Sequence, residues 1–232
     1  MSKIKSLAFK GFSLQSIKFL QALSINNSKV WFEKHREEYL SYILAPLQSL
    51  IREIGPSLLD IDKELEITPA VNKTISRIYR DTRFSKDKSP YKSNVWATFK
   101  IRQSNNWQTL PTYFFEFSVS GYKYGMGFYK ALPSVMTSLR ASITEDPKSF
   151  LKAIKFYERE NEFELGGEEY KRDFNPALDE KIKVWYQKKN LYLIAKRDID
   201  DDFLSSQLIT KLSKSFKSLA PIYKYLKKMA TR

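Results

Sequence analysis

The stretch NVWATFKIRQSNNWQTLPTYFFEFSVSGYKYGMGFY, residues 94–129, decides the fold class. Apolar and polar side chains alternate in three runs within it, at residues 94–101, 112–120 and 122–129. Alternation with a period of two is typical of a strand with one buried face. Ser120-Gly121 separates the last two runs and predicts a hairpin turn. The stretch therefore predicts a central antiparallel meander with one face in the core.

The alternation also predicts which side chains of the meander are buried. The inward positions are Val95, Ala97, Phe99, Ile101, Tyr113, Phe115, Phe117, Val119, Tyr122, Tyr124, Met126 and Phe128. Gly125 and Gly127 fall on the opposite face of the last run. Because glycine has no side chain, a helix or a ligand could approach the backbone closely there.

Helical patterns flank this run of strands on both sides. They cover residues 13–25, 28–54, 133–143, 145–160 and 175–189, and a further strand is expected at 191–199. Gly55-Pro56 predicts the end of the second helix, because proline removes a backbone donor. A long amphipathic helix is expected at 201–229, with aspartates at its start and lysines at its end. This order predicts a single α+β domain over residues 1–232 rather than a doubly wound parallel sheet.

Composition excludes several kinds of chemistry. The 232 residues contain 15% aromatic and 42% hydrophobic side chains, which favours a folded chain over a disordered one. The absence of cysteine excludes disulfides, thiolate metal sites and cysteine nucleophiles. His35 is the one histidine, which excludes a two-histidine metal site; we expect it to be a partly buried structural residue. The sequence predicts no metal site and does not specify a cofactor.

The net charge of +14 favours anionic partners. A phosphate-bearing ligand and nucleic acid both fit this charge, and so does a basic protein without an anionic ligand. The first residues lack the features of a signal peptide, and no apolar run reaches the roughly 18 residues of a membrane span. Together with the cysteine-free composition, this predicts a cytoplasmic protein without a membrane span.

The segment RIYRDTRFSKDKSPYKSN, residues 77–94, is the strongest candidate for a site. Guanidinium groups match phosphate or carboxylate oxygens in a two-bond geometry, and lysine adds point charge. The predicted anion ligands are Arg77, Arg80, Arg83, Ser85, Lys88, Tyr91 and Lys92. Asp81 and Asp87 are the candidate catalytic residues, as a general base or as ligands of a hard cation such as magnesium. No P-loop, dinucleotide fingerprint, H-E-x-x-H or G-x-S-x-G motif occurs in the chain.

A purely structural interpretation of the segment stays open. Asp81 can pair with a neighbouring arginine, and Asp87 can pair with Lys88 or with an arginine from elsewhere. Phe84 and Tyr91 could anchor the loop in the core, so that its charges only satisfy one another. If residues 75–80 are extended, Arg77 and Arg80 point to opposite faces and can meet one ligand only where the chain turns.

The segment resembles the signature of a family of bacterial and fungal proteins known as a domain of unknown function (DUF2461-like). Its pattern, R-x-x-R-D-x-R-F-S-x-D-K-x-P-Y-K, is matched from Arg77 to Lys92 at every fixed position. Residues 12–39 and 127–143 resemble two further blocks of the family. Where relatives tend to carry a histidine-proline pair, this chain has Asn175-Pro176, so a role of that histidine would be lost here. The resemblance implies a single α+β domain and no settled activity.

Three functions follow from these observations. The first is an anion-binding protein or phosphoester-processing enzyme that uses the loop at 77–92. The second is a nucleic-acid-binding module without chemistry, although no helix-turn-helix, RNA-recognition or zinc-finger signature is present. The third is a scaffold or interaction protein in which the charged loop is structural.

Overall fold

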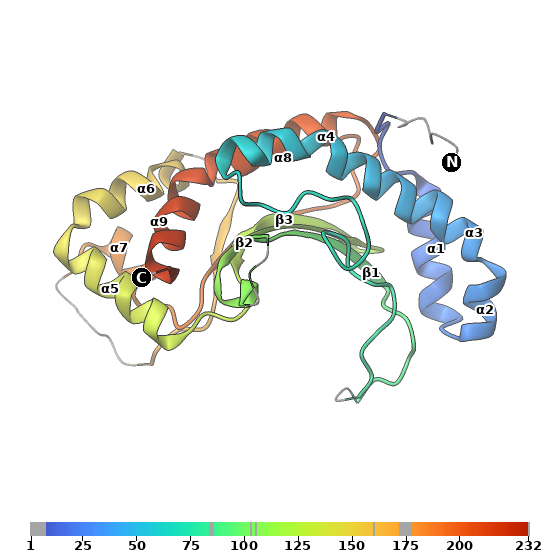
Figure 1. Ribbon diagram of the computed structural model, residues 1–232, viewed down its shortest axis with the longest axis horizontal. Coiled ribbons are helices and arrows are strands. Elements are labelled where there is room, and N and C mark those ends of the chain that lie inside the picture. The colour runs from blue at the N-terminus through green and yellow to red at the C-terminus, as the bar shows by residue number, and fades with distance from the viewer. Residues whose placement is uncertain are drawn as a thin grey trace. The chain divides into compact units, whose positions relative to one another are not determined.

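The computed structural model has the α+β architecture that the sequence predicts. It describes residues 8–83, 86–102, 104, 106–159, 161–171 and 178–231. A five-stranded antiparallel sheet has the strand order β1-β2-β3-β5-β4, and helices precede and follow its first three strands in the chain (Figure 1). The meander of three consecutive strands is therefore confirmed.

Strands β1–β3 bury the side chains that the alternation marks as inward. Their bounds are Asn94–Phe99 for β1, Pro111–Ser118 for β2 and Gly121–Phe128 for β3. Eleven of the twelve predicted inward side chains are buried. The exception is Val119, which is 44% exposed because β2 ends one residue earlier and Val119 lies in the turn. A short 3-10 helix, Trp107–Thr109, precedes β2.

The two glycines of β3 lie against another strand. Strand β5, Tyr192–Arg197, pairs antiparallel with the short strand β4, Glu164–Gly166. A Cβ atom at Gly125 would lie 1.9 Å from the Leu193 carbonyl oxygen, and one at Gly127 would lie 2.3 Å from the Cβ of Tyr192. The close approach that the glycines predicted is thus made by β5, and glycine is required because any side chain would collide with it.

The described chain forms two compact units that we treat separately. Unit 1 contains residues up to Phe99 together with 115–123 and 197–214, and unit 2 contains residues 100–114, 124–196 and 215–232. Both units take residues from β2 and β3, so neither is a contiguous piece of the sequence. The single-domain interpretation stays a prediction.

Unit 1 begins with the helices drawn in blue to cyan in Figure 1. These are α1 (Leu14–Ile25), α2 (Lys29–Lys34), α3 (Arg36–Glu38), a π-helical turn (Tyr39–Leu44) and α4 (Ala45–Ile61). Pro46 lies in the first turn of α4, directly after the π-helical turn. The predicted end at Gly55-Pro56 is wrong, because α4 continues to Ile61. Leu58 and Ile61 are buried in that last stretch, so packing outweighs the one hydrogen bond lost at Pro56.

Aromatic rings fill the core of unit 1. Phe12 lies 4.8 Å from Phe203, 4.5 Å from Phe117 and 5.8 Å from Phe115, measured between ring centroids. All four rings are buried. The segment that precedes α1 and the segment that precedes α8 therefore pack onto the same face of β2.

Unit 2 is built around three neighbouring helices. They are α5 (Pro133–Glu145), α6 (Pro147–Arg159) and α9 (Ala220–Ala230), each in contact with the other two (Figure 1). The short helix α7 (Glu180–Tyr186) contributes the buried ring of Trp185, which contacts Phe150 and Tyr157 edge-on. The start of the helix predicted at 175–189 lies partly outside the described residues.

The predicted C-terminal amphipathic helix consists of two segments. A single residue separates helix α8, Gln207–Ser218, from α9, and Pro221 occupies the first turn of α9. Residues 201–206 form turns rather than helix. The expected apolar stripe is buried along both segments, from Leu208 to Leu226. Among the described residues, we find no helix with the length and apolar character that crossing a membrane requires.

Candidate functional site

The candidate loop in unit 1 closes through backbone pairing of its two ends. Tyr79 lies opposite Tyr91 in an antiparallel bridge. The amide of Arg80 donates to the Pro90 carbonyl at 2.8 Å, and the amide of Lys92 donates to the Ile78 carbonyl at 2.9 Å. Because side chains alternate along extended chains, this register places Arg80 and Lys92 on the face opposite the two tyrosine rings. The chain also bends at Ile78, between Arg77 and Arg80, which is the condition under which these two side chains can meet one ligand.

Asn27 fastens this loop to the turn between α1 and α2. Its Oδ1 accepts from the amide of Tyr91 at 2.9 Å, and its Nδ2 donates to the carbonyl of Tyr91 at 3.0 Å. One side chain therefore satisfies both backbone groups of a residue 64 positions away. The helical patterns at 13–25 and 28–54 leave Asn27 between two helices and do not predict this contact.

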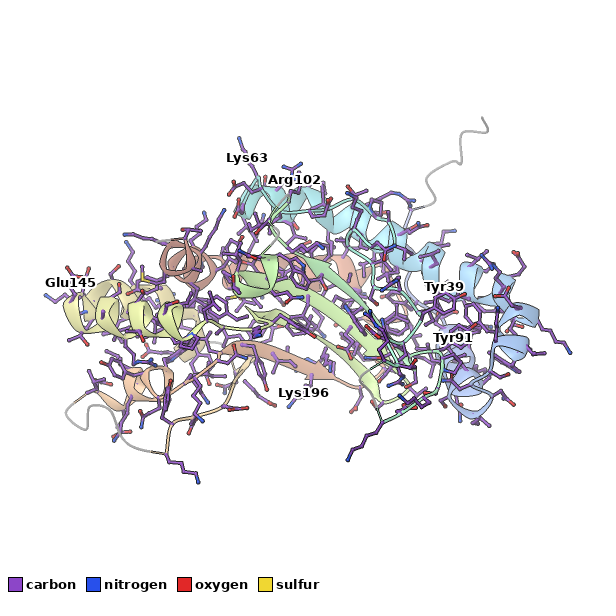
Figure 2. The ribbon with its side chains drawn as sticks, turned by 60° about the horizontal axis from the view of Figure 1, so that its bottom comes forward. Tyr39, Lys63, Tyr91, Arg102, Glu145 and Lys196 are labelled. Carbon is purple, nitrogen blue, oxygen red and sulfur yellow. The ribbon has the colours of Figure 1, made fainter. Side chains whose placement is uncertain are left out.

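Four aromatic rings join the loop to the first helices. Phe32 stacks on Tyr91 at 4.2 Å and lies 5.5 Å from Tyr39, and Tyr79 lies 5.1 Å from Tyr91. Figure 2 shows Tyr39 and Tyr91 close together. Burial, and then the nearby Tyr79, raises the pKa of Tyr39 to about 12 and that of Tyr91 to about 12. Tyr91 is fully buried, so it forms the base of the loop rather than part of its surface.

Arg80 makes an ion pair across the loop. Its Nη1 lies 3.1 Å from Oδ2 of Asp87, and its Nη2 donates to the Tyr91 carbonyl at 3.5 Å. Its Nε is buried without a hydrogen-bond partner among the described residues, so the guanidinium group keeps an unused donor. The other oxygen of Asp87 accepts from the Ser89 hydroxyl at 2.6 Å and from the Ser89 amide at 2.9 Å. These hydrogen bonds, and then the charge of Arg80, lower the pKa of Asp87.

Arg83 and Asp81 form a local pair that is exposed to solvent. Nε and Nη2 of Arg83 donate to the two carboxylate oxygens of Asp81 at 3.0 Å and 2.8 Å. The side-chain and backbone hydrogen bonds from Arg83 come first among the causes that lower the pKa of Asp81 to about 2. This pair matches the structural interpretation, since both members are engaged with each other.

Lysines on the two sides of the loop donate to backbone carbonyls. Lys88 Nζ donates to the Thr82 carbonyl at 2.8 Å, and Lys92 Nζ donates to the Arg77 carbonyl. Lys92 Nζ also lies 4.2 Å from the ring centroid of Trp96. Burial comes first, followed by the charges of Arg77 and Arg80, among the causes that lower the pKa of Lys92. Lys92 is therefore close enough to Arg77 and to Arg80 to be repelled by both charges.

The structure thus divides the predicted site residues into groups. Arg80 and Lys92 lie on one face of the base of the loop, and Lys92 Nζ donates to the carbonyl of Arg77, while Arg83 pairs locally and Lys88 binds a carbonyl of the loop. Ser85, predicted as a ligand, and Phe84, predicted as an anchor, lie outside the described residues. Among the residues described, no three acidic, histidine or cysteine side chains are grouped so that they could hold a metal ion.

His35 is half-buried, as the sequence predicts, and contacts Trp31. Its ring stacks on Trp31 with the centroids 4.0 Å apart, and its Nδ1 lies 2.8 Å from the Trp31 carbonyl oxygen. The ring is half-buried at the end of α2. These contacts hold the imidazole ring against Trp31.

The model of one protein family, described as conserved hypothetical protein (DUF2461), matches residues 15–225. The chain belongs to this family. The match covers most of both units, and it includes the loop at 77–92 together with the helices that hold it. No curated protein matches the chain. Residues 175–176, where the family resemblance departs, lie outside the described part of the chain.

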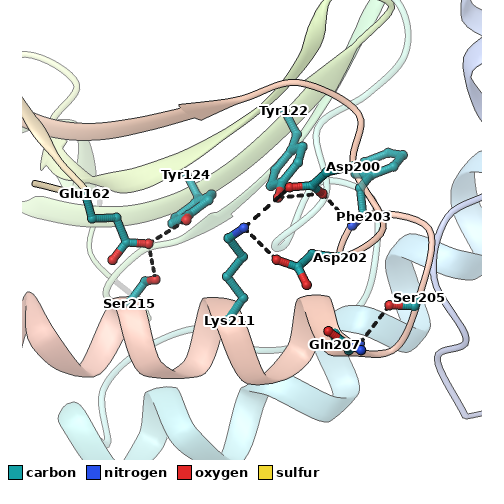
Figure 3. Close-up of polar contacts among 10 residues, drawn as sticks. All are labelled: Tyr122, Tyr124, Glu162, Asp200, Asp202, Phe203, Ser205, Gln207, Lys211 and Ser215. Atoms are coloured by element: carbon teal, nitrogen blue, oxygen red, sulfur yellow. Dashed lines mark hydrogen bonds and ion pairs between the residues drawn. The ribbon is translucent and has the colours of Figure 1, made fainter.

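This DUF2461 chain contains a second polar cluster in unit 1, which precedes α8. Both carboxylate oxygens of Asp200 accept from the Tyr122 hydroxyl at 3.0 Å, and the amide of Phe203 donates to Asp200 at 2.9 Å (Figure 3). Lys211 Nζ lies 2.7 Å from Asp202 and 3.5 Å from Asp200. Burial, and then the hydrogen bond to Asp200, raises the pKa of Tyr122. The aspartates predicted at a helix start therefore fasten the turn before α8 to β3.

Unit 2 of the DUF2461 chain has a third cluster, around Glu162. Its Oε1 accepts from the Tyr124 hydroxyl at 2.6 Å and from the Ser215 hydroxyl at 2.7 Å (Figure 3). Tyr124 and Ser215 are both buried. Among the described contacts of Glu162 and Ser215, none comes from a histidine or lysine that could activate the serine hydroxyl.

Proposed function

We propose that the loop at 77–92 binds a phosphate-bearing molecule through Arg77, Arg80 and Lys92. The observation that carries the proposal is that Arg80 and Lys92 lie on one face of the closed base of the loop and that Lys92 Nζ reaches the backbone carbonyl of Arg77. Mutual repulsion among like charges is unfavourable, and an anion placed among them would relieve it. Guanidinium and ammonium groups are the side chains that bind phosphate most strongly.

Two features of Arg80 support this assignment. Its Nε has no hydrogen-bond partner among the described residues, and one nitrogen of its guanidinium group contacts a carboxylate. The Arg80 side chain is 30% exposed and that of Asp87 is 54% exposed. Exposed ion pairs contribute at most about 1 kcal/mol, so a phosphate can compete with Asp87 for Arg80.

Binding is better supported than catalysis. A general base works best when its pKa lies near the operating pH, whereas the pKa values of Asp81 and Asp87 are both lowered. The phosphoester-processing form of the proposal therefore requires Asp87 to leave Arg80 when the substrate enters. The roles of Asp81 and Asp87 as base or cation ligand stay predictions, as does the cytoplasmic location.

A titration with inorganic phosphate tests the proposal. The arginine Nε–H signals are followed by NMR at constant ionic strength, held with sodium chloride. We expect the Arg80 signal to shift saturably, and Arg77→Gln to weaken binding about tenfold, equivalent to about 1.4 kcal/mol. Arg83→Gln is the matched control, since it removes the same charge from the same loop but from a guanidinium group that already pairs with Asp81.

Asp87→Asn separates the binding and structural interpretations. If phosphate and Asp87 compete for Arg80, the variant binds phosphate more tightly than the wild-type protein. If the loop is only structural, the variant lowers the melting temperature and no phosphate binding is measured in either protein. Equal losses of affinity in Arg77→Gln and Arg83→Gln would contradict a specific site.

Nucleic acid is the polymeric alternative as the source of the phosphate. A single-stranded oligonucleotide in a gel shift at two ionic strengths tests it, because neutralising several phosphates makes affinity fall steeply with salt. Oligonucleotide binding without saturable binding of inorganic phosphate would favour the nucleic-acid-binding module over the small-ligand site. Tyr79, which is 48% exposed, is the ring of the loop on which a base would stack.

A further inference from the structure

A concave surface lies in unit 2, and the residues that line it are far in sequence from the loop at 77–92. It is a pocket of about 500 Å³ where the end of α5, the first half of α6 and the outer face of α9 meet. This volume is within the range of about 300–1,000 Å³ that is typical of small-molecule sites. Glu145, labelled in Figure 2 at the end of α5, is one of its lining residues.

Three lysine side chains line this pocket. Lys224 and Lys228 are one turn apart on α9 and share a face, and Lys152 comes from α6. Each of the three side chains is exposed, and none forms an ion pair among the described residues. Like charges one turn apart destabilise a helix slightly, whereas Lys228 in the last turn of α9 also interacts favourably with the helix dipole. An anion in the pocket would turn the repulsion into attraction.

Hydroxyl groups and apolar side chains complete the lining. The hydroxyls of Ser142 and Tyr225 lie 2.8 Å apart and join α5 to α9. Ser149 adds a third hydroxyl from the first turn of α6. Ala153 and Met229 are buried and belong to the lining, so its deeper part is apolar. A few polar groups over an apolar base are the usual composition of a small-molecule site.

Two carboxylates on the same rim restrict the kind of anion. Glu145 and Asp146 line the pocket at the end of α5, and Asp146 Oδ1 accepts from the Ser149 amide at 3.0 Å. A polymer with a phosphate at every step would bring negative charge against both carboxylates. A small molecule can place its phosphate near the lysines and turn hydroxyl groups toward the carboxylates, which accept hydrogen bonds.

We propose that this pocket binds a small phosphate-bearing molecule that also carries hydroxyl groups. Lys152, Lys224 and Lys228 contact the phosphate, and Glu145 accepts hydrogen bonds from the hydroxyl groups. Asp146 remains the cap of α6. The inference does not depend on the loop at 77–92, because the two sets of residues belong to different units.

Glycerol 3-phosphate is a suitable probe, with inorganic phosphate, glycerol and a single-stranded oligonucleotide as comparisons. The methyl signal of Met229 reports on the pocket, and the buried methyls of Met126 and Met136 serve as internal references outside its lining. In the full chain at constant ionic strength, we expect glycerol 3-phosphate to shift the Met229 signal saturably and at lower concentration than inorganic phosphate. Glycerol alone should produce no shift.

Paired substitutions of exposed lysines give the matched control. Lys224→Gln with Lys228→Gln should raise the dissociation constant at least about tenfold, since two charge-assisted contacts are lost. Lys155→Gln with Lys217→Gln removes the same charge from exposed positions of unit 2 outside the pocket. This control pair should change the dissociation constant less than about twofold.

Three results would overturn the proposal. The first is a Met229 signal that does not saturate with glycerol 3-phosphate, and the second is an equal loss of affinity in the two double variants. The third is an oligonucleotide that shifts Met229 at lower concentration than glycerol 3-phosphate does. The variant Arg77→Gln should leave the Met229 titration unchanged, so failure of the loop proposal and failure of this one can be told apart.

Discussion

Asn27→Ala tests how the loop at 77–92 is held in place. The substitution removes both hydrogen bonds between Asn27 and the backbone of Tyr91, at 2.9 Å and 3.0 Å. Both are partly buried, and a typical intramolecular hydrogen bond contributes about 1 kcal/mol. We therefore expect the free energy of unfolding to fall by about 2 kcal/mol, which for a chain of this size lowers the melting temperature by about 4–8 °C.

The neighbouring residue provides the control. The side chain of Asn26 donates to the Ala22 carbonyl at 3.0 Å and is exposed. Asn26→Ala should change the free energy of unfolding by about 0.5 kcal/mol or less. Calorimetry and urea unfolding measure the free energy of unfolding of both variants. The difference between the two variants removes effects that any substitution in this turn would have.

Hydrogen exchange gives a second measurement of the same variant. The amides of Tyr91, Lys92 and Arg80 donate within the closed base of the loop, so all three should exchange slowly in the wild-type protein. In Asn27→Ala, exchange at Tyr91 should accelerate most, because its partner is lost. If Asn27→Ala and Asn26→Ala unfold at the same temperature and Tyr91 stays protected, the reasoning about the Asn27 contact is refuted.

Three further predictions concern other parts of the chain. The Asp81 carboxyl should titrate near pH 2 and move toward its ordinary value of 3.8 in Arg83→Gln; because its pKa is lowered in the folded chain, the small stability it adds is present above pH 3.8 and is lost as the pH falls toward 2. Tyr122→Phe should lower stability by about 1–2 kcal/mol in urea unfolding, since a charge-assisted hydrogen bond to Asp200 is lost; an unchanged midpoint would contradict this. Gly127→Ala should lower the melting temperature or the yield of folded protein, because the new methyl group would overlap β5; a variant as stable as the wild type would show that β5 can move away.

The strands could be predicted from the sequence because their signal is local. Alternation at residues 94–128 depends on neighbours two positions apart, and it identifies the buried face of β1, β2 and β3 at all but one position. The failure at Val119 has the same origin, since alternation continues into the turn without marking where β2 ends. The continuation of α4 past Pro56 could not be predicted, because it depends on the burial of Leu58 and Ile61 by distant residues.

The candidate site could be predicted only in part, for a similar reason. The pair between Asp81 and Arg83 spans two residues and was among the alternatives that the sequence allowed. The pair between Arg80 and Asp87 and the contacts of Asn27 require the chain to fold back on itself, which local spacing does not specify. For the position of Asn27 beside the loop, the strongest sequence signal was the family block at residues 12–39. Phe32 of that block stacks on Tyr91.

Charge counts alone overstate what the loop can bind, because some of its cations are already engaged. Arg83 uses two donors on Asp81, so its charge is largely neutralised before any ligand arrives. Arg80 pairs with the carboxylate of Asp87 and keeps its Nε donor without a partner among the described residues. Lys92 lies near the positive charges of Arg77 and Arg80. The pair between Arg83 and Asp81 is therefore separate from the cations that would hold a phosphate, whereas Arg80 belongs both to an ion pair and to the proposed site. For this reason a structural role for Asp81 and a binding role for Arg80 do not exclude each other, and substitutions of equal charge at Arg77 and Arg83 must give different results if the loop is a site.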